Sequence, residues 1–349
     1  MSSGDLPPPP ERFARLKKEI ATTYLDFEAK ATKSWGEIIA ELGGAVASIE
    51  GKGSNCIPQV KFQDLETLDA ETVARIKRVG TVVIRDIVDD EEAAKWKDDL
   101  KQFAKDNPEV DGVDLSVPLT YADRFRIRKP GQAWGFHPPH IDGNTIHTTL
   151  QDALGARTSL YGRPSQSTVF RTFQGWLAMS ETAPGEGTLQ VFPDVLLSNA
   201  YIILRPFFRP RTPAASSSDA LNDPKNWEFD VTDPLFHGIR PRDGGIPRPN
   251  ATPELHPHLQ LEKTMISIPK VYPGDAVLLA LMDHNGTGDS AVMYIPAVPK
   301  TPMNLAYVAR QKECFLQGRT APRTFPKARA KRVKRIYISP AGRVAIGFA

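Results

Sequence analysis

Apolar residues recur at helical spacing near the start of the chain. Between Glu11 and about Leu42 they fall loosely about three or four positions apart, with polar residues between them. A segment that contains Gly and Ser follows, up to about Gln59, and its composition predicts a loop. We therefore expect a helix at the start of the chain, separated by this loop from the elements that follow.

The next segment carries alternating helix and strand signals. Asp69 can cap a helix over Ala70–Val79 by accepting hydrogen bonds from its first amides, and Gly80 is a typical helix end. The β-branched run Thr81–Ile84 predicts a strand. Acidic residues then suit the N-terminus of a further helix over residues 89–103. The expected order is helix, strand, helix.

Short apolar runs separated by turn residues dominate the middle of the chain. The expected strands are Phe125–Ile127, Val169–Met179, Thr188–Phe192, Tyr201–Leu204, Met265–Ile268 and Ala276–Leu281. A segment rich in Pro, Ser and Asp, about residues 209–256, predicts a surface loop with little regular structure. A last helix is expected over Pro302–Gln317. The 31 prolines favour strands joined by turns over a helical bundle, so we predict a mainly β fold with flanking helices.

Composition narrows the class of protein. The 349 residues include only two cysteines, Cys56 and Cys314, which excludes a disulfide scaffold and favours a reducing, cytoplasmic location. The start of the chain has no apolar signal region, and no run of about 18 apolar residues predicts a membrane span. The net charge of +3 is small for this length and indicates no particular partner.

His140 and Asp142 are the first candidates for chemistry. In an extended strand, residues two apart point to the same side, so an imidazole and a carboxylate would meet at one point. They would supply two of the three ligands of a 2-His-1-carboxylate site, which suits iron(II) and leaves positions open for substrate and oxygen. The alternative is a surface turn, because Pro139 precedes the pair and Gly143 follows it.

Basic residues alternate shortly before this pair. Arg124, Arg126 and Arg128 would make one face of a strand cationic, and such a face could hold a dicarboxylate. The alternative is a strand face that is simply solvated.

Longer motifs are similar to those of known oxygenases. The segment QGWLAMSETAPGEGTLQVFP, Gln174–Pro193, resembles the central strands of phytanoyl-CoA-dioxygenase-like oxygenases. The motifs FHPPHIDG, DVLLSNAYIILRPFF, PGD at Pro273–Asp275 and HNGTGDSAVMYIP resemble the DUF1479 family of bacteria and fungi, over about Phe62–Pro326. This resemblance implies a double-stranded β-helix, that is, a cupin-like jelly roll, with an iron(II) and 2-oxoglutarate site. It implies no particular substrate.

The resemblance also implies a third iron ligand shortly before the HNG motif. The interval from Asp275 contains no histidine until His284, so His284 is the best remaining distal ligand. The alternative is that His284 caps the Asn285-Gly286 turn and binds no metal. His147 is a weaker candidate, because it lies too near Asp142 to come from a separate strand.

The remaining histidines are interpreted as structural or solvated. His256 and His258 flank Pro257 in the predicted insertion loop, where a solvated pair is favoured over a pair of metal ligands. His237 is expected to be a loop residue.

Binding of 2-oxoglutarate requires a cation for its distal carboxylate, and an Arg fork matches a carboxylate with two hydrogen bonds. Arg171 is the first candidate, since a charge between Val169 and Phe173 should not be buried unpaired; its alternative is a structural ion pair. Arg126 is the second candidate. Gln174 could share the face of Arg171's strand that lines the pocket.

Three segments are predicted along the chain. Residues 1–60 would form an N-terminal helical extension, residues 61–326 the jelly-roll domain, and residues 327–349 a basic tail. The tail includes KARAKRVKR, which could bind nucleic acid, but we interpret it as a solvated, disordered segment.

Three functions remain open from the sequence. The first is an iron(II)/2-oxoglutarate dioxygenase that hydroxylates a small molecule. The second is a catalytically impaired jelly-roll protein that has lost the distal iron ligand and at most binds a small acid. The third is a metal-dependent cupin isomerase or hydrolase, which would not need 2-oxoglutarate.

Overall fold

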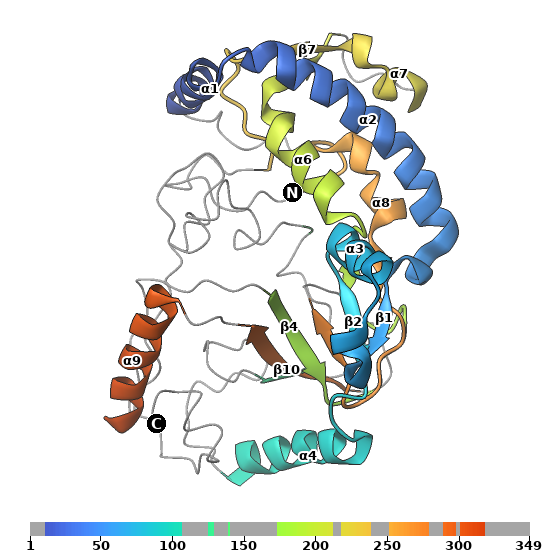
Figure 1. Cartoon of the computed structure of the whole chain (residues 1–349), viewed down its shortest axis with the longest axis vertical. Coiled ribbons are helices and arrows are strands. Elements are labelled where there is room, and N and C mark those ends of the chain that lie inside the picture. Colours follow the sequence, from blue (N-terminus) through green and yellow to red (C-terminus); the bar gives the residue numbers. More distant parts are fainter. Residues whose placement is uncertain are drawn as a thin grey trace.

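The structure is a computed structural model and describes residues 11–106, 125–128, 139, 173–211, 218–238, 251–278, 289–297 and 301–317. A helical region built around one long helix lies at one end of the molecule, and a β-sheet region lies below it (Figure 1). Within the described residues, no helix combines the length and the apolar character that crossing a membrane requires.

The helical region begins with α1 (Arg12–Thr23) and α2 (Phe27–Lys52). The predicted helix at the start of the chain is confirmed, but it breaks between these two elements. The loop expected before Gln59 is wrong over its first part, because α2 continues through Gly43, Gly44 and Gly51 to Lys52. Its apolar residues keep helical spacing past the first two of those glycines, so one face stays buried throughout: Ala31, Trp35, Ile38, Ile39, Leu42, Val46 and Ile49.

Helix α6 (Val195–Leu204) packs against α2 in the same region (Figure 1). The strand predicted over Tyr201–Leu204 is therefore wrong. The side chain of Asp194 accepts a hydrogen bond from the amide of Leu197, which caps the helix, and the apolar run lacks a period that would distinguish strand from helix. Contact with the apolar face of α2 favours the helix over the strand.

The predicted insertion loop is largely structured where the structure describes it. After the 3-10 turn η5 (Arg205–Phe207), β6 (Phe208–Pro210) pairs with β7 (Trp227–Phe229). Between and after them lie α7 (Ser218–Asn222), η6 (Pro224–Asn226), η7 (Pro257–Leu259) and α8 (Leu261–Thr264). Trp227 is 7% exposed and Phe236 is 1% exposed, so these parts are core and not a surface loop. Their aromatic residues pack against Trp35 of α2, which stacks on Phe208 with ring centroids 4.7 Å apart.

The segment with alternating signals folds as its sequence predicts. The 3-10 turn η2 (Gly53–Cys56), strand β1 (Gln59–Lys61) and η3 (Phe62–Thr67) lead to α3 (Ala70–Val79). Asp69 accepts a 2.7 Å hydrogen bond from the amide of Thr72, and Gly80 ends the helix with φ at 76°. Strand β2 (Val82–Arg85) and helix α4 (Asp90–Asp106) follow in the expected order.

The main sheet has six described strands in the order β1-β2-β9-β4-β10-β3. Besides β1 and β2 it contains β3 (Phe125–Arg128), β4 (Phe173–Ala178), β9 (Ala276–Leu278) and β10 (Ser290–Ala297). Only the β1–β2 pair is parallel among these strands; the other described pairs are antiparallel. A second sheet joins β5 (Gln190–Val191) and β8 (Ile266–Ser267). Strands β2, β3, β4, β5, β8 and β9 lie where strands were predicted, whereas β1 and β10 were not predicted. The jelly-roll topology stays a prediction.

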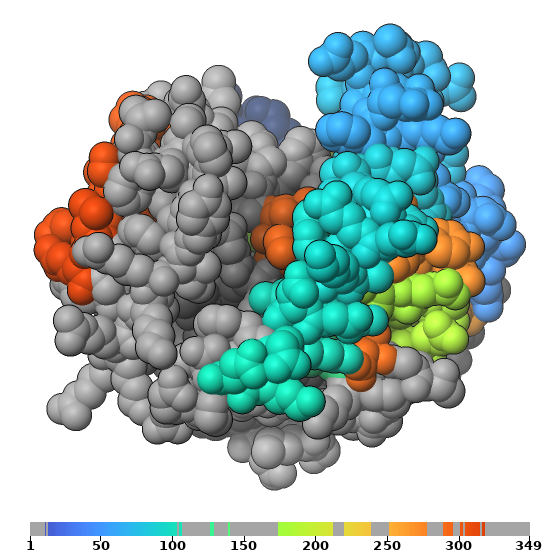
Figure 2. All heavy atoms as spheres, turned by 90° about the horizontal axis from the view of Figure 1, so that it is seen from below, coloured from blue at the N-terminus to red at the C-terminus, as the bar shows by residue number. Residues whose placement is uncertain are grey.

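The two faces of the main sheet pack against different partners. On one face, Val83, Trp176, Val277 and Val292 join an apolar cluster with Val191, Ile266 and other residues of the β5–β8 sheet. We call this the inner face. On the other face, Ile127 and Ala291 contact Trp96 and Leu100 of α4, which lies across the lower side of the molecule (Figure 2). The last described helix, α9 (Pro302–Leu316), confirms the prediction for this segment.

Candidate functional site

Two predicted cofactor-binding residues lie on the inner face of the main sheet. Strand β10 separates β3 from β4, and its register pairs Val292 with Arg126 and Pro296 with Gln174. Directly paired residues in an antiparallel sheet point to the same side, as do residues two apart on a strand. Arg126 and Gln174 therefore point to the same side as Trp176 and Val292, residues of the inner-face cluster.

Arg126 is a buried cation at this position. Arg126 is 6% exposed, and its guanidinium carbon lies 5.7 Å from the centroid of the Tyr294 ring. Burial lowers the pKa of Arg126, while the neighbouring Tyr294 raises it. Because the ordinary pKa of a guanidinium is so far above neutrality, the side chain keeps its charge at pH 7. A guanidinium donates two parallel hydrogen bonds to a carboxylate, so this face carries a donor that suits a small acid.

Arg128 lies two residues further along the same face of β3. It is 2% exposed, and its Nη2 donates a 2.7 Å hydrogen bond to the carbonyl of Gly187 and a 3.4 Å bond to the hydroxyl of Ser290. Neither Arg126 nor Arg128 is solvated, so the solvated-face alternative is wrong for both. Arg128 ties β3 to the turn before β5, which positions the cationic face.

Gln174 and Trp176 complete the described part of this face. Gln174 is half-buried and Trp176 is 8% exposed. Tyr294 pairs with Trp176 across β4 and β10, and its ring also lies beside the guanidinium of Arg126. We call Arg126, Gln174, Trp176 and Tyr294 the inner-face site. Its chemistry is that of a cation and an amide held against two aromatic rings, which suits a small carboxylic acid.

The residues predicted to bind iron lie outside the described part of the chain. These are His140, Asp142 and His284, and the same holds for Arg171 and His147. The residue next to His140 is described: the carbonyl of Pro139 accepts a 2.8 Å hydrogen bond from the amide of Ala251. In the described residues, no group of three His, Cys, Asp or Glu side chains is arranged to hold a metal ion.

The prediction that His256 and His258 are solvated is wrong. They are 0% and 1% exposed, because Pro257 starts the turn η7 and places both imidazoles under α2 and α6. The hydroxyl of Tyr201 donates to Nδ1 of His258 at 3.0 Å, and Nε2 of His258 donates to the carbonyl of Leu221 at 3.1 Å. Burial lowers the pKa of each histidine to about 3, so both are neutral.

His237 lies in a loop, as predicted, but it is buried as well, at 8% exposure. Burial lowers its pKa well below the ordinary value. Its ring centroid lies 6.3 Å from that of His256. The sequence carried one signal for these positions: Leu255, Leu259 and Leu261 surround the histidines, which indicates a segment that packs inward.

Comparisons with known proteins give the class of this chain. A match to the Gig2-like family spans residues 5–115 and 149–338, so the chain belongs to the Gig2-like family. The match begins earlier and ends later than the resemblance over Phe62–Pro326, and it includes part of the basic tail. It leaves out residues 116–148, which contain His140 and Asp142.

Particular relatives are similar in sequence or in fold. The chain is 28% identical to the uncharacterized protein YbiU of Escherichia coli K12 over 261 residues, which are 65% of this chain and 54% of YbiU. It therefore spans about half the length of this curated relative. The crystal structure of GIG2 (DUF1479) from Candida albicans has a TM-score of 0.71 at 25% identity, covering 91% of this chain and 82% of GIG2.

A third relative agrees in fold. The crystal structure of the "Putative Oxidoreductase" from Salmonella typhimurium LT2 has a TM-score of 0.68 at 20% identity, covering 98% of both chains. The DUF1479 part of the predicted resemblance is thus confirmed.

Proposed function

We propose that this chain is a non-haem iron(II), 2-oxoglutarate-dependent dioxygenase on a jelly-roll scaffold, which hydroxylates a small molecule. The observation that carries the proposal is the buried guanidinium of Arg126 on the inner face, beside Tyr294 and on the same face as Gln174. Two sheets, antiparallel apart from the β1–β2 pair, enclose an apolar interior, which agrees with a jelly roll, and the name of the Salmonella protein agrees with redox chemistry.

In this proposal the described residues hold the co-substrate and exclude water. The Arg126 fork would bind the distal carboxylate of 2-oxoglutarate, and the rings of Tyr294 and Trp176 would shield this ion pair from solvent. Gln174 would donate or accept a further hydrogen bond. His140, Asp142 and His284 would ligate the iron. When bound, iron(II) and 2-oxoglutarate would together activate molecular oxygen, the oxidant: one oxygen atom would go into succinate as 2-oxoglutarate loses carbon dioxide, and the other would hydroxylate a substrate carbon.

The test is a titration of the purified chain with iron(II) and 2-oxoglutarate under anaerobic conditions. We expect a weak visible charge-transfer band, and release of succinate after oxygen is admitted. His140→Ala and Asp142→Ala should abolish both signals. Arg126→Met should weaken 2-oxoglutarate binding by roughly tenfold or more, because a hydrogen-bonded ion pair is lost. Arg15→Met is the matched control, since the Arg15 side chain is 76% exposed on α1.

The outcome decides between the functions that the sequence leaves open. Binding of 2-oxoglutarate by the wild type that depends on Arg126, with no band and no succinate, would favour the small-acid binding protein. Metal binding without any response to 2-oxoglutarate would favour a cupin isomerase or hydrolase. Equal binding by wild type and Arg126→Met would remove Arg126 from the site.

A further inference from the structure

A second group of polar side chains is buried in the helical region. Lys17 of α1, Arg205 of η5, His237 and His256 come from four segments that are far apart in sequence. All four residues are at most 8% exposed. We call them the Lys17 cluster. It lies on different elements from the inner-face site and plays no part in the function proposed above.

Lys17 is a buried ammonium that lies over an aromatic ring. The residue is 1% exposed, and Nζ lies 5.5 Å from the centroid of the Phe236 ring. Within the part of the chain that the structure describes, Lys17 has no hydrogen bond or ion pair among its interactions. Burial lowers its pKa to about 8, so most Lys17 side chains still carry a proton at pH 7. Burying such a cation costs free energy of folding unless an acceptor forms a hydrogen bond or ion pair with it.

Both imidazoles of the cluster also have an unused nitrogen. The amide of Thr252 points at Nδ1 of His256 at 3.4 Å, and a backbone amide can only donate. Neutral His256 therefore carries its proton on Nε2, which is buried without a partner among the described residues. Nδ1 of His237 is buried without a partner in the same sense.

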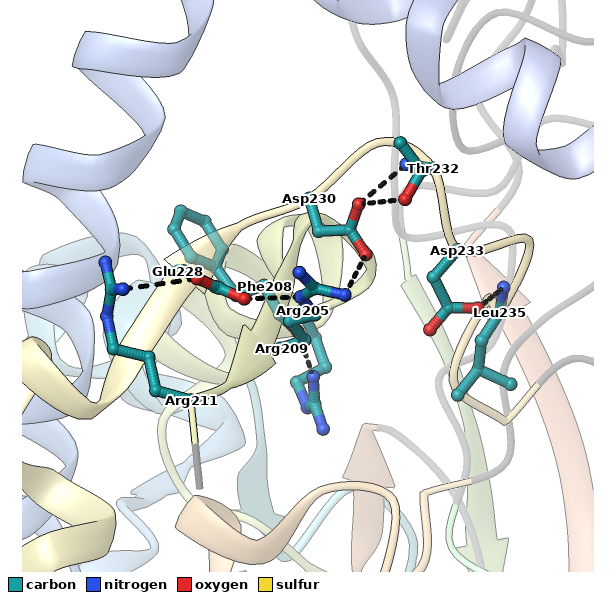
Figure 3. Close-up of polar contacts among 9 residues, drawn as sticks. All are labelled: Arg205, Phe208, Arg209, Arg211, Glu228, Asp230, Thr232, Asp233 and Leu235. Atoms are coloured by element: carbon teal, nitrogen blue, oxygen red, sulfur yellow. Dashed lines mark hydrogen bonds and ion pairs between the residues drawn. The ribbon is translucent and has the colours of Figure 1, made fainter. Parts of the chain in front are cut away.

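Asp230 and Asp233 attract Lys17, and each accepts hydrogen bonds from its own loop, although Oδ2 of Asp230 is buried without a hydrogen-bond partner among the described residues. One oxygen of Asp230 accepts hydrogen bonds from the amide and hydroxyl of Thr232, both at 2.7 Å, and its other oxygen lies 3.8 Å from Arg209 (Figure 3). Asp233 accepts a 2.8 Å bond from the amide of Leu235 (Figure 3). These carboxylates attract Lys17 through space, but they do not bond to it.

Arg205 adds a second positive charge. Its Nε donates to the carbonyl of Leu255 at 3.0 Å, its Nη1 donates to the carbonyl of Phe208 at 2.7 Å, and its guanidinium lies over the ring of Trp227. These neutral acceptors do not cancel its charge, which lowers the pKa of His237 and His256. The cluster therefore presents two cations, a proton donor on His256 and an open nitrogen on His237.

This arrangement does not suit a metal ion. A metal on Nε2 of His256 would require the proton to move to Nδ1, where the Thr252 amide already points. Lys17 and Arg205 would also repel a cation. A ligand with negative charge and acceptor oxygens would satisfy the ammonium and the Nε2 proton together.

We propose that the Lys17 cluster binds a small oxyanion, held between the ammonium of Lys17 and the imidazoles of His237 and His256. Arg205 stabilises the bound charge from one side. Phe236 and Phe13, whose ring centroids are 5.4 Å apart, close α1 over the loop that carries His237. The chemistry fits either an inorganic oxyanion or the carboxylate of a small acid.

The test measures the thermal unfolding midpoint of the full chain without iron or 2-oxoglutarate. Phosphate and sulfate form one arm, formate and acetate form the other, and chloride at equal ionic strength is the reference. At about ten times its Kd, the favoured oxyanion should raise the midpoint by about 2 °C. The arm that responds identifies the source of the oxyanion.

Lys17→Met should abolish this response, and Lys18→Met, on the exposed neighbour in the same helix, should retain it. His256→Phe should weaken binding by roughly tenfold, because one charge-assisted hydrogen bond is lost. A wild type that responds no more to any oxyanion than to chloride overturns the proposal, and so does an equal response in Lys17→Met. If Lys17→Met does not fold, phosphorus NMR line broadening of phosphate on the wild type, competed by sulfate, decides the inorganic arm, and carbon NMR of labelled acetate, competed by formate, decides the carboxylate arm.

Discussion

The hydroxyl of Tyr201 donates a hydrogen bond to Nδ1 of His258 at 3.0 Å, in the interior formed by α2, α6 and η7. The bond fixes the histidine tautomer, because Nε2 must then carry the proton that it donates to the carbonyl of Leu221. The two residues lie 57 positions apart in the sequence. One hydrogen-bonded chain thus connects α6, η7 and α7 through groups that water does not reach.

Removing the Tyr201 hydroxyl should destabilise the fold. Tyr201→Phe keeps the ring but leaves Nδ1 of His258 buried without a donor, which we expect to cost about 1–3 kcal/mol. Urea unfolding followed by tryptophan fluorescence measures the change. Tyr24→Phe is the control, because Tyr24 is 58% exposed, and it should change stability by less than about 0.5 kcal/mol. Equal losses of stability in the two variants would contradict the conclusion that the Tyr201–His258 hydrogen bond stabilises the fold.

The buried histidines should make stability depend on acid. The pKa of His256 and of His258 is lowered from 6.5 to about 3, so between these values the unfolded chain binds protons that the folded chain does not. The contribution of these histidines to the free energy of unfolding is therefore fully present above about pH 6.5. It falls as the pH drops toward 3, by up to about 1.4 kcal/mol per pH unit for each imidazole. Urea midpoints between pH 7 and pH 4 measure the slope.

His258→Gln should make that slope shallower, since one of three buried imidazoles no longer titrates and only those of His237 and His256 remain, while lowering stability at pH 7. A slope unchanged in the variant would show that other groups dominate the acid response. The pKa of Lys17 is also lowered, to about 8, but its effect falls in another range: it makes stability rise with pH between about 8 and 10.5.

Gly274 cannot be replaced without moving the backbone of a neighbouring segment. Its φ is +85°, and a Cβ atom there would lie 1.9 Å from the carbonyl oxygen of Val88. Gly274→Ala should cost about 3 kcal/mol or more, because left-handed strain adds to the clash. Gly44→Ala is the control: Gly44 lies inside α2 with no atom within 4 Å of its Cβ position, so it should gain up to about 1 kcal/mol. Chemical unfolding measures both, and a tolerated Gly274→Ala would refute the close approach.

The ion pair between Arg85 and Asp275 should matter far more than one on the surface. The Asp275 side chain is 4% exposed and also accepts a 2.9 Å bond from the amide of Tyr272. Arg85→Met leaves a buried carboxylate without its cation, which we expect to cost about 3–5 kcal/mol. Arg15→Met breaks a pair with Glu19 whose side chains are 76% and 54% exposed, at a cost of at most about 1 kcal/mol. Similar urea unfolding midpoints for the two variants would contradict the expected difference between a buried and an exposed ion pair.

Much of the local structure follows from residues that are neighbours in sequence. Asp69 and Gly80 mark the ends of α3, and the β-branched run between Gly80 and Asp86 forms β2, because caps and strand propensity act over a few residues. The alternation on β3 and β4 likewise predicts that Arg126 and Arg128 share a face, and that Gln174 and Trp176 do. For the inner-face site, the sequence therefore predicts which residues share a face within each strand, but it does not predict that these strands lie in one sheet.

The arrangement of β3 near β4 depends on β10, which lies between them. Strand β10 comes more than a hundred residues after β4 and still pairs with both β4 and β3. No periodicity within a strand encodes such a pairing. The same holds for two of the predictions that were wrong. Residues Tyr201–Leu204 are helical, and His256 and His258 are buried, because α2 supplies an apolar surface from the other end of the chain. Local hydrogen bonding and side-chain period are properties of the sequence, whereas burial depends on which distant segment covers a residue, and only the tertiary structure decides that.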